Sequence, residues 1–177
     1  RGKVTVWSEE LADTVQRYHL GGIVLFGENI DTEEQTKQLI ADMRNSGDIP
    51  LLIGVDEEGG RVSRLNASGK LDVEKIPSAM EIGSTKDPDV AYQAGKTIGM
   101  ELKELGIDID FAPVADVATN PENSVIGDRS FSSDPTIAGE MVAAFIRGLH
   151  ESDISATAKH FPGHGDTQED SHVGAAV

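Results

Sequence analysis

The sequence predicts an α/β fold in which parallel strands alternate with helices along the chain. The predicted strands are short and apolar without polar alternation, which is typical of strands buried on both faces of a parallel sheet. Between them lie longer stretches with apolar residues at helical spacing, opened by residues that cap helix N-termini. The resulting order, αβαβαβαβ, favours a parallel sheet with right-handed crossover connections.

The helices are predicted from their capping residues. Ser8 is an N-cap, Thr32 with Gln35 matches a capping box, and Asp87 and Asp134 each precede a proline at the first helical position. A glycine follows the first and third helices and ends them. The predicted helices cover residues 8–19, Thr32 to about Asn45, Asp87 to Leu105, and a stretch from Asp134 with apolar residues between Ile137 and Leu149.

The predicted strands cover residues 23–26, 51–55, 107–114 and 155–161. Residues 61–83 are less regular and predict a loop with short helical turns. We find no linker, repeat or low-complexity tract that would divide the chain, and 177 residues is a single-domain length.

The composition excludes several classes of function. Fifteen Lys and Arg against 31 Asp and Glu give a net charge of -16, which disfavours binding to nucleic acid. The absence of cysteine excludes disulfides, thiolate catalysis and zinc–thiolate sites. No apolar run approaches the ~20 residues of a membrane-spanning helix. The cytoplasm of a bacterium and a secreted or cell-surface location are both compatible with this composition.

Polar side chains follow each predicted strand at the point where the strand ends. They include Glu28, the segment 56–61, Asp116 with the segment 120–129, and Lys159 with His160. The carboxyl ends of parallel strands share one edge of the sheet, which is where α/β enzymes build their sites. We therefore expect these groups to converge, and this convergence indicates an enzyme.

Each of these groups also has a purely structural interpretation. The run from Asp56 to Gly60 could be a solvated turn, and Arg129 could pair with Asp128 on the surface. His164, between two glycines, could serve only to shape its loop. Lys159 and His160 follow an apolar strand directly, so they must point into a site or a satisfied polar network.

The segment from Lys159 to His172 holds three of the five histidines of the chain. Groups that titrate near neutrality are often gathered at functional sites. Asp170 and His172 are two residues apart, and a carboxylate that orients a histidine provides a general acid/base. The same His and Asp residues could instead bind a metal, but Pro162 and its neighbouring glycines argue against a helix that would align them.

Five segments of the chain resemble the family 3 glycoside hydrolases, in the branch of the β-N-acetylglucosaminidases. They are spread over nearly the whole chain in the order of the family, and the last is highly specific to this branch. The matching segments are residues 21–26, 56–64, 110–116, 127–131 and 159–172.

The resemblance implies a fold, an activity and a set of site residues. The fold would be a (β/α)8 barrel of the TIM type, present over residues 1–177 as about four strands. The activity would be that of a retaining exo-β-N-acetylglucosaminidase, which uses an acid/base dyad of Asp170 and His172 and needs no cofactor or metal. The residues implied to hold the N-acetylglucosamine ring are Asp56, Arg64, Arg129, Lys159 and His160.

The family pattern also predicts what this chain lacks. The four strands would be the second to fifth of the barrel, and the aspartate nucleophile would follow a later strand. We therefore expect the 177-residue chain to be inactive alone, and its open sheet edges to favour self-association. A metal-dependent hydrolase using the His and Asp cluster, and a non-catalytic sugar-binding half-domain, are the alternatives.

Overall fold

The structure, a computed structural model, describes residues 3–167. The predicted alternation of helices and strands is confirmed within them, with one further short helix and three 3-10 turns. The helices are α1 (Glu9–Tyr18), α2 (Glu33–Arg44), α3 (Ala79–Ser84), α4 (Pro88–Leu105) and α5 (Pro135–Glu151). The strands are β1 (Gly22–Leu25), β2 (Leu52–Val55), β3 (Ile109–Asp110) and β4 (Ser155–Ala156). The 3-10 turns are η1 (Gly27–Asn29), η2 (Leu65–Ala67) and η3 (Gly127–Arg129).

The strands form one parallel sheet in the order β1-β2-β3-β4. In the register, Leu25 lies opposite Val55, Val55 opposite Asp110, and Asp110 opposite Ala156. Each strand pairs with the one before it in the chain, so the sheet winds in one direction, as in a (β/α)8 barrel. A doubly wound sheet would reverse its strand order. The topology therefore agrees with the predicted barrel-type α/β class.

The third and fourth strands are shorter than the sequence predicted. Pro113 interrupts the third, because proline has no N–H to donate to the ladder. The chain nevertheless continues in an extended course, and Val114 forms an isolated parallel bridge with Lys159. This bridge extends the pairing of the two segments, and it places Lys159 and His160 at the end of the sheet.

The prediction that the strands are buried on both faces is wrong for β1 and the start of β2. Val24 is 43% exposed and Leu52 is 53% exposed, whereas Ile53 and Val55 on the opposite face are fully buried. The helices cover one face only, and within residues 3–167 little covers the other. In a closed barrel the uncovered face would line the packed interior.

The predicted helix caps are largely confirmed. Ser8, Asp87 and Asp134 each accept a hydrogen bond from a backbone N–H of the first turn. The capping box at Thr32 is only half formed, because the Gln35 side chain accepts from the N–H of Asp31 and not from that of Thr32. No helix within residues 3–167 combines the length and the apolar character needed to cross a membrane.

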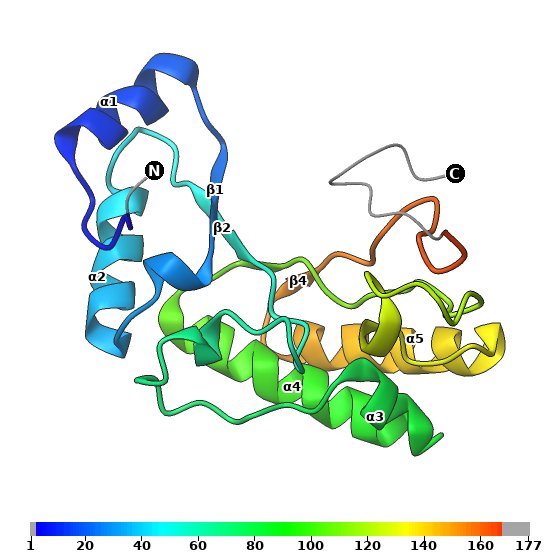
Figure 1. Cartoon of the computed structure of the whole chain (residues 1–177). Coiled ribbons are helices and arrows are strands. Elements are labelled where there is room, and N and C mark those ends of the chain that lie inside the picture. Colours follow the sequence, from blue (N-terminus) through cyan, green and yellow to red (C-terminus); the bar gives the residue numbers. More distant parts are fainter. Residues whose placement is uncertain (1–2, 168–177) are drawn as a thin grey trace.

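Helices α4 and α5 pack side by side through glycines, whereas α1 and α2 lie at the β1 end of the sheet (Figure 1). A Cβ added to Gly148 of α5 would lie 2.2 Å from the carbonyl oxygen of Tyr92, and one on Gly95 of α4 would lie 2.2 Å from that of Phe145. The two backbones therefore approach more closely than any side chain would allow. This contact fixes the helix pair that supports β3 and β4.

Replacing Gly148 by alanine should destabilise the protein by about 1–3 kcal/mol, because the added methyl group would force the two helices apart. Gly139 lies in the same helix, and a methyl group added there would meet nothing within 4 Å, so Gly139→Ala is the matched control. The control should be neutral or stabilising by about 0.5–1 kcal/mol. Urea unfolding measures both, and equal midpoints for the two variants would show that the close approach does not matter.

Candidate active site

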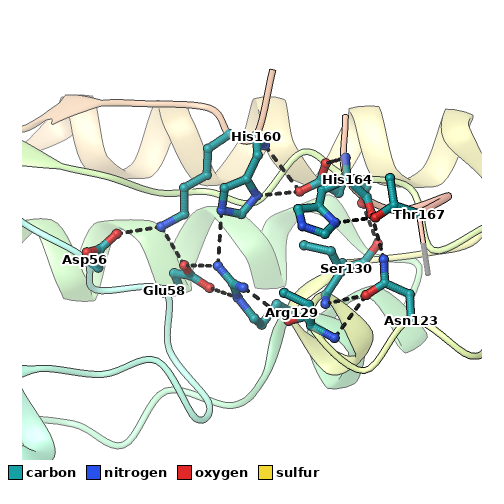
Figure 2. A network of polar contacts seen from close by, with 12 residues as sticks. Asp56, Glu58, Asn123, Arg129, Ser130, His160, His164 and Thr167 are labelled. Carbon is teal, nitrogen blue, oxygen red and sulfur yellow. Dashed lines mark hydrogen bonds and ion pairs between the residues drawn. The ribbon is translucent and has the colours of Figure 1, made fainter. Parts of the chain in front are cut away.

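The side chains that follow β2, β3 and β4 meet at the carboxyl edge of the sheet. Figure 2 shows Glu58, from the loop after β2, facing Arg129 of η3, which in turn contacts His160 after β4, while Asp56 lies on the other side of Glu58. Their convergence, predicted from the strand ends, is confirmed. Three loops thus supply these four side chains: the loop after β2 supplies Asp56 and Glu58, the loop after β3 supplies Arg129, and the loop after β4 supplies His160.

Lys159 joins the last strand to the loop after β2. Its Nζ atom lies 2.6 Å from Oδ1 of Asp56 and 2.6 Å from Oε1 of Glu58. The Lys159 side chain is only 15% exposed, and that of Glu58 only 5%. A buried carboxylate is stable only when it is paired and hydrogen-bonded, so these contacts determine where the ammonium group must lie.

Arg129 supplies the second cation to Glu58. Its Nε and Nη2 atoms each lie 2.8 Å from one carboxylate oxygen, which is the bidentate geometry of a strong pair. Burial alone would raise the pKa of Glu58, but hydrogen bonds from Arg129 and Lys159 outweigh it and hold the pKa below its usual value. The surface alternative for Arg129 is not observed, because Asp128 pairs with Arg61 at 2.8 Å.

Arg64 lies at the margin of this cluster. Its Nη2 atom is 3.9 Å from Oδ2 of Asp56, and its guanidinium lies over the ring of Phe26 at 5.7 Å from the centroid. Its Nε is buried and lacks a hydrogen-bond partner within the described residues. Arg64 is thus near Asp56, but it is more loosely attached than Lys159.

His160 is oriented by a carboxylate that the sequence analysis did not single out as a site residue. Nδ1 of His160 lies 2.7 Å from Oδ2 of Asp116, and Nε2 lies 3.3 Å from Nη2 of Arg129. A guanidinium can only donate, so Nε2 accepts and the proton of a neutral ring sits on Nδ1. Burial would raise the pKa of Asp116, but hydrogen bonds from His160 and His164 hold it below its usual value.

His164 shapes its loop, as one interpretation of the sequence held. It is 9% exposed, its backbone N–H donates to Oδ1 of Asp116 at 2.6 Å, and its Nδ1 lies 2.6 Å from the hydroxyl of Thr167. The carbonyl of His164 also accepts from Nδ2 of Asn123 at 2.6 Å. These bonds tie the loop after β4 to the loop after β3.

An open hollow of about 210 Å3 lies beside these groups. It is bordered by Asp116, Lys159, His160 and the turn from Phe161 to Gly163. Charged groups of both signs therefore border a space large enough for part of a small polar ligand. Donors on Lys and acceptors on Asp suit a ligand that carries hydroxyl groups.

Two residues of the site, Glu58 and Asp116, were not predicted as site residues from the sequence. Glu58 lies in a run of three acids, and nothing in the run tells which member faces two cations. Asp116 stands two residues after Val114 and five before Pro121, and its partners come from a loop more than forty residues away. The position of polar groups after strand ends marked the segment that contains Glu58 and marked Asp116 itself, but it did not indicate the partners of either carboxylate.

Two further carboxyl groups near the site are buried and form no ion pair within residues 3–167. Asp110 of β3 is fully buried, its Oδ1 accepts from the N–H of Glu57 at 2.9 Å, and its Oδ2 has no partner within the described residues. Burial is the main cause that raises the pKa of Asp110 well above its usual value. Burial also raises the pKa of Glu57, against hydrogen bonds from Ser63, Leu65 and Arg64.

The predicted dyad, Asp170 and His172, lies outside the described residues. Among residues 3–167, no three His, Cys, Asp or Glu side chains are arranged so that they could hold a metal ion. The alternative of a metal-dependent hydrolase therefore finds no ligand set in this part of the chain. The geometry that remains is a charged, partly buried pocket edge formed by three loops.

The sequence matches the model of the glycosyl hydrolase family 3 N-terminal domain over residues 3–177. The chain belongs to glycosyl hydrolase family 3. The match covers nearly the whole chain, so the fold is that of the N-terminal domain of this family. The resemblance that the five sequence segments carried is thereby confirmed.

Individual relatives agree with this assignment. The chain is 38% identical over 182 residues to β-hexosaminidase A of Pseudoalteromonas piscicida, covering 98% of the chain and 30% of that protein. A family 3 β-N-acetylglucosaminidase from Paenibacillus sp. str. FPU-7 superimposes with a TM-score of 0.89 and 38% identity, covering 95% of the chain and 32% of that protein.

A third relative is NagZ from Neisseria gonorrhoeae, solved in complex with N-trifluoroacetyl-D-glucosamine. It superimposes with a TM-score of 0.87 and 32% identity, covering 99% of the chain and 52% of NagZ. The chain thus spans between 30% and 52% of the length of these three family members.

Asp110→Asn should make stability less sensitive to pH. Burial raises the pKa of Asp110 in the folded state, so the folded state holds this proton to a higher pH than the unfolded chain does. This group therefore makes the folded state less stable as the pH rises above about 4. Asparagine keeps the oxygen that accepts from Glu57 and carries no titrating proton. The free energy of unfolding of the variant should therefore rise relative to that of wild type as the pH increases above about 4.

Urea unfolding at several pH values tests this prediction. Asp13→Asn is the matched control, because Asp13 lies exposed on α1. Curves for wild type and Asp110→Asn that stay parallel across this range would show that Asp110 is already ionised in the folded protein.

Proposed function

We propose that this chain is the substrate-holding part of the catalytic barrel of a retaining exo-β-N-acetylglucosaminidase. The observation that carries the proposal is the cluster of Asp56, Arg129, Lys159 and His160 in a family 3 domain, of which Lys159 and His160 border an open hollow. The names of relatives, β-hexosaminidase A and a β-N-acetylglucosaminidase, support the same activity.

The cluster suits a terminal N-acetylglucosamine ring. The ammonium of Lys159 and the guanidinium of Arg129 present N–H donors, and Asp56 presents acceptors to hydroxyl groups. Arg64 and His160 complete the proposed set of ring-holding residues. Because Glu58 already fixes both cations in place, their orientation costs little when the sugar binds. We expect cell-wall muropeptides or chitooligosaccharides as the source of such a ring.

We assign the acid/base role to the dyad of Asp170 and His172. His172 would protonate the leaving oxygen and then take a proton from the attacking water, while Asp170 orients its ring. This arrangement departs from the usual pair of carboxylic acids in glycosidases. A histidine suits the role because its ordinary pKa lies close to neutrality.

A retaining mechanism also needs a carboxylate nucleophile on the opposite face of the sugar. Asp56 and Glu58 are each held by cations, which lowers the nucleophilicity of their carboxylates. We therefore place the nucleophile in the part of the relatives that this chain does not span. On this proposal residues 1–177 supply the second to fifth strands of the barrel.

The full-length protein that contains this sequence should hydrolyse aryl β-N-acetylglucosaminides. A change of His172→Ala should slow the release of poor leaving groups by about 10²–10⁴-fold, because general acid catalysis contributes that much. Good leaving groups such as dinitrophenolate need no proton, so their first step should be far less affected. Steady-state kinetics with a series of leaving groups measures the difference.

His150→Ala is the matched control, because His150 lies exposed at the end of α5. Its rates should equal those of wild type with every leaving group. Equal losses of kcat/KM, which reports the first step, for good and poor leaving groups in the His172 variant would remove the acid role. Absence of turnover by wild type would remove the proposed activity.

The 177-residue chain prepared alone should show no turnover, because we place the nucleophile outside it. It should also self-associate, since β1 and β4 each have one edge without a strand partner within the described residues. An aryl glycoside assay and light scattering on the same sample check both points. Hydrolysis by this chain would refute the placement of the nucleophile, and a stable monomer would refute the association.

A further inference from the structure

Arg61 ties the loop after β2 to the loop after β3. Its Nη2 atom donates to the carbonyl oxygens of Ser124, Val125 and Ile126, at 3.0, 2.7 and 3.2 Å. Its Nε atom lies 2.8 Å from Oδ1 of Asp128. One guanidinium thus bonds four groups in the five residues that precede Arg129.

The bonds of Arg61 gather three successive carbonyl groups of this segment around one atom. Three successive carbonyl groups that point at one place repel one another unless a cation lies between them. A guanidinium is suited to the task, because its planar fork offers several donors at once. The Asp128 carboxylate balances its charge. The side chain of Arg61 is 47% exposed, so its role does not come from burial.

Arg129 itself uses the same segment. Its Nη1 atom donates to the carbonyl of Val125 at 3.2 Å, the same oxygen that accepts from Arg61. The two guanidinium groups therefore share one acceptor, and the position of that acceptor depends on Arg61. On the other side, Oδ1 of Asn123 accepts from the N–H groups of Val125 and Ile126 at 3.0 and 2.9 Å.

We infer that Arg61 is a positioning residue that acts through Arg129. It holds residues 124–128 so that the guanidinium of Arg129 faces Glu58 and His160. Arg61 itself does not touch the substrate. The inference rests on the proposed function, in which Arg129 holds the sugar, but the clamp on the segment can be tested without any activity.

The kinetic test uses the full-length protein and an aryl β-N-acetylglucosaminide. Arg61→Met should lower kcat/KM by about 10–100-fold, which is the scale of a misplacement of about 1 Å. Arg61→Lys should recover part of the loss, because an ammonium reaches fewer of the carbonyl groups. Asp128→Asn keeps the three carbonyl bonds and should cost less than Arg61→Met. Lys70→Met, which breaks a surface pair with Asp31, should leave kcat/KM unchanged.

A double-mutant cycle separates positioning from general destabilisation. In an Arg129→Ala background, Arg61→Met should cause little further loss of kcat/KM, because the residue it acts through is gone. A further loss of the same size as in wild type would overturn the inference.

Hydrogen exchange provides the readout that needs no activity. Arg61→Met should speed exchange of the amides of Gly127 and Arg129, which donate to Asn123 and Ile126. The amides of α4 should keep their wild-type rates and serve as the internal control. Unchanged exchange at residues 125–129 would overturn the clamp. If wild type were inactive but exchange were faster in the Arg61→Met variant, the proposed function would be refuted, while the inference that Arg61 holds residues 124–128 in place would be supported.

Discussion

The site depends on one buried carboxylate, Glu58. Its side chain is 5% exposed, and such a group is stable only if cations replace the water it has lost. Arg129 and Lys159 provide them from two other loops. The position of Glu58 therefore determines where both cations lie, and through Arg129 it also determines the setting of His160. The pairs around Glu58 link the loops after β2, β3 and β4 into one unit.

The buried carboxyl groups of this domain fall into two kinds with opposite consequences. Glu58 and Asp116 have cationic or N–H partners that hold their pKa values down, so both supply fixed negative charge near neutrality. Asp110 and Glu57 form no ion pair in the described part of the chain, and burial raises their pKa values. Glu58 and Asp116 orient the side chains of the site. Asp110 and Glu57 accept backbone hydrogen bonds in the loop after β2, and because their pKa values are raised they lower the free energy of unfolding as the pH rises.

Much of the fold could be predicted from the sequence because its signals are local. Asp87 and Asp134 before prolines set the starts of α4 and α5, and the apolar runs located β1 and β2. Pro113 is itself a local signal against a continuous strand, but the apolar residues around it led to the prediction of one strand over residues 107–114. The exposure of Val24 and Leu52 could not be predicted from the sequence, because the burial of a side chain depends on what packs against the strand and not on the strand itself.

The location of the site could be predicted from the sequence, but the pairing of its side chains could not. The strand-end rule brings loops together whatever their sequence, so it located Asp56, Arg129, Lys159 and His160. Which acid pairs with which base depends on loop conformation, and here the loops fix one another. Asp116 accepts from the backbone of His160 and His164, Asn123 donates to the carbonyl of His164, and Arg61 binds the segment before Arg129. Each of these bonds joins residues more than forty positions apart, so the order of the site is a property of the assembled edge and not of any single motif.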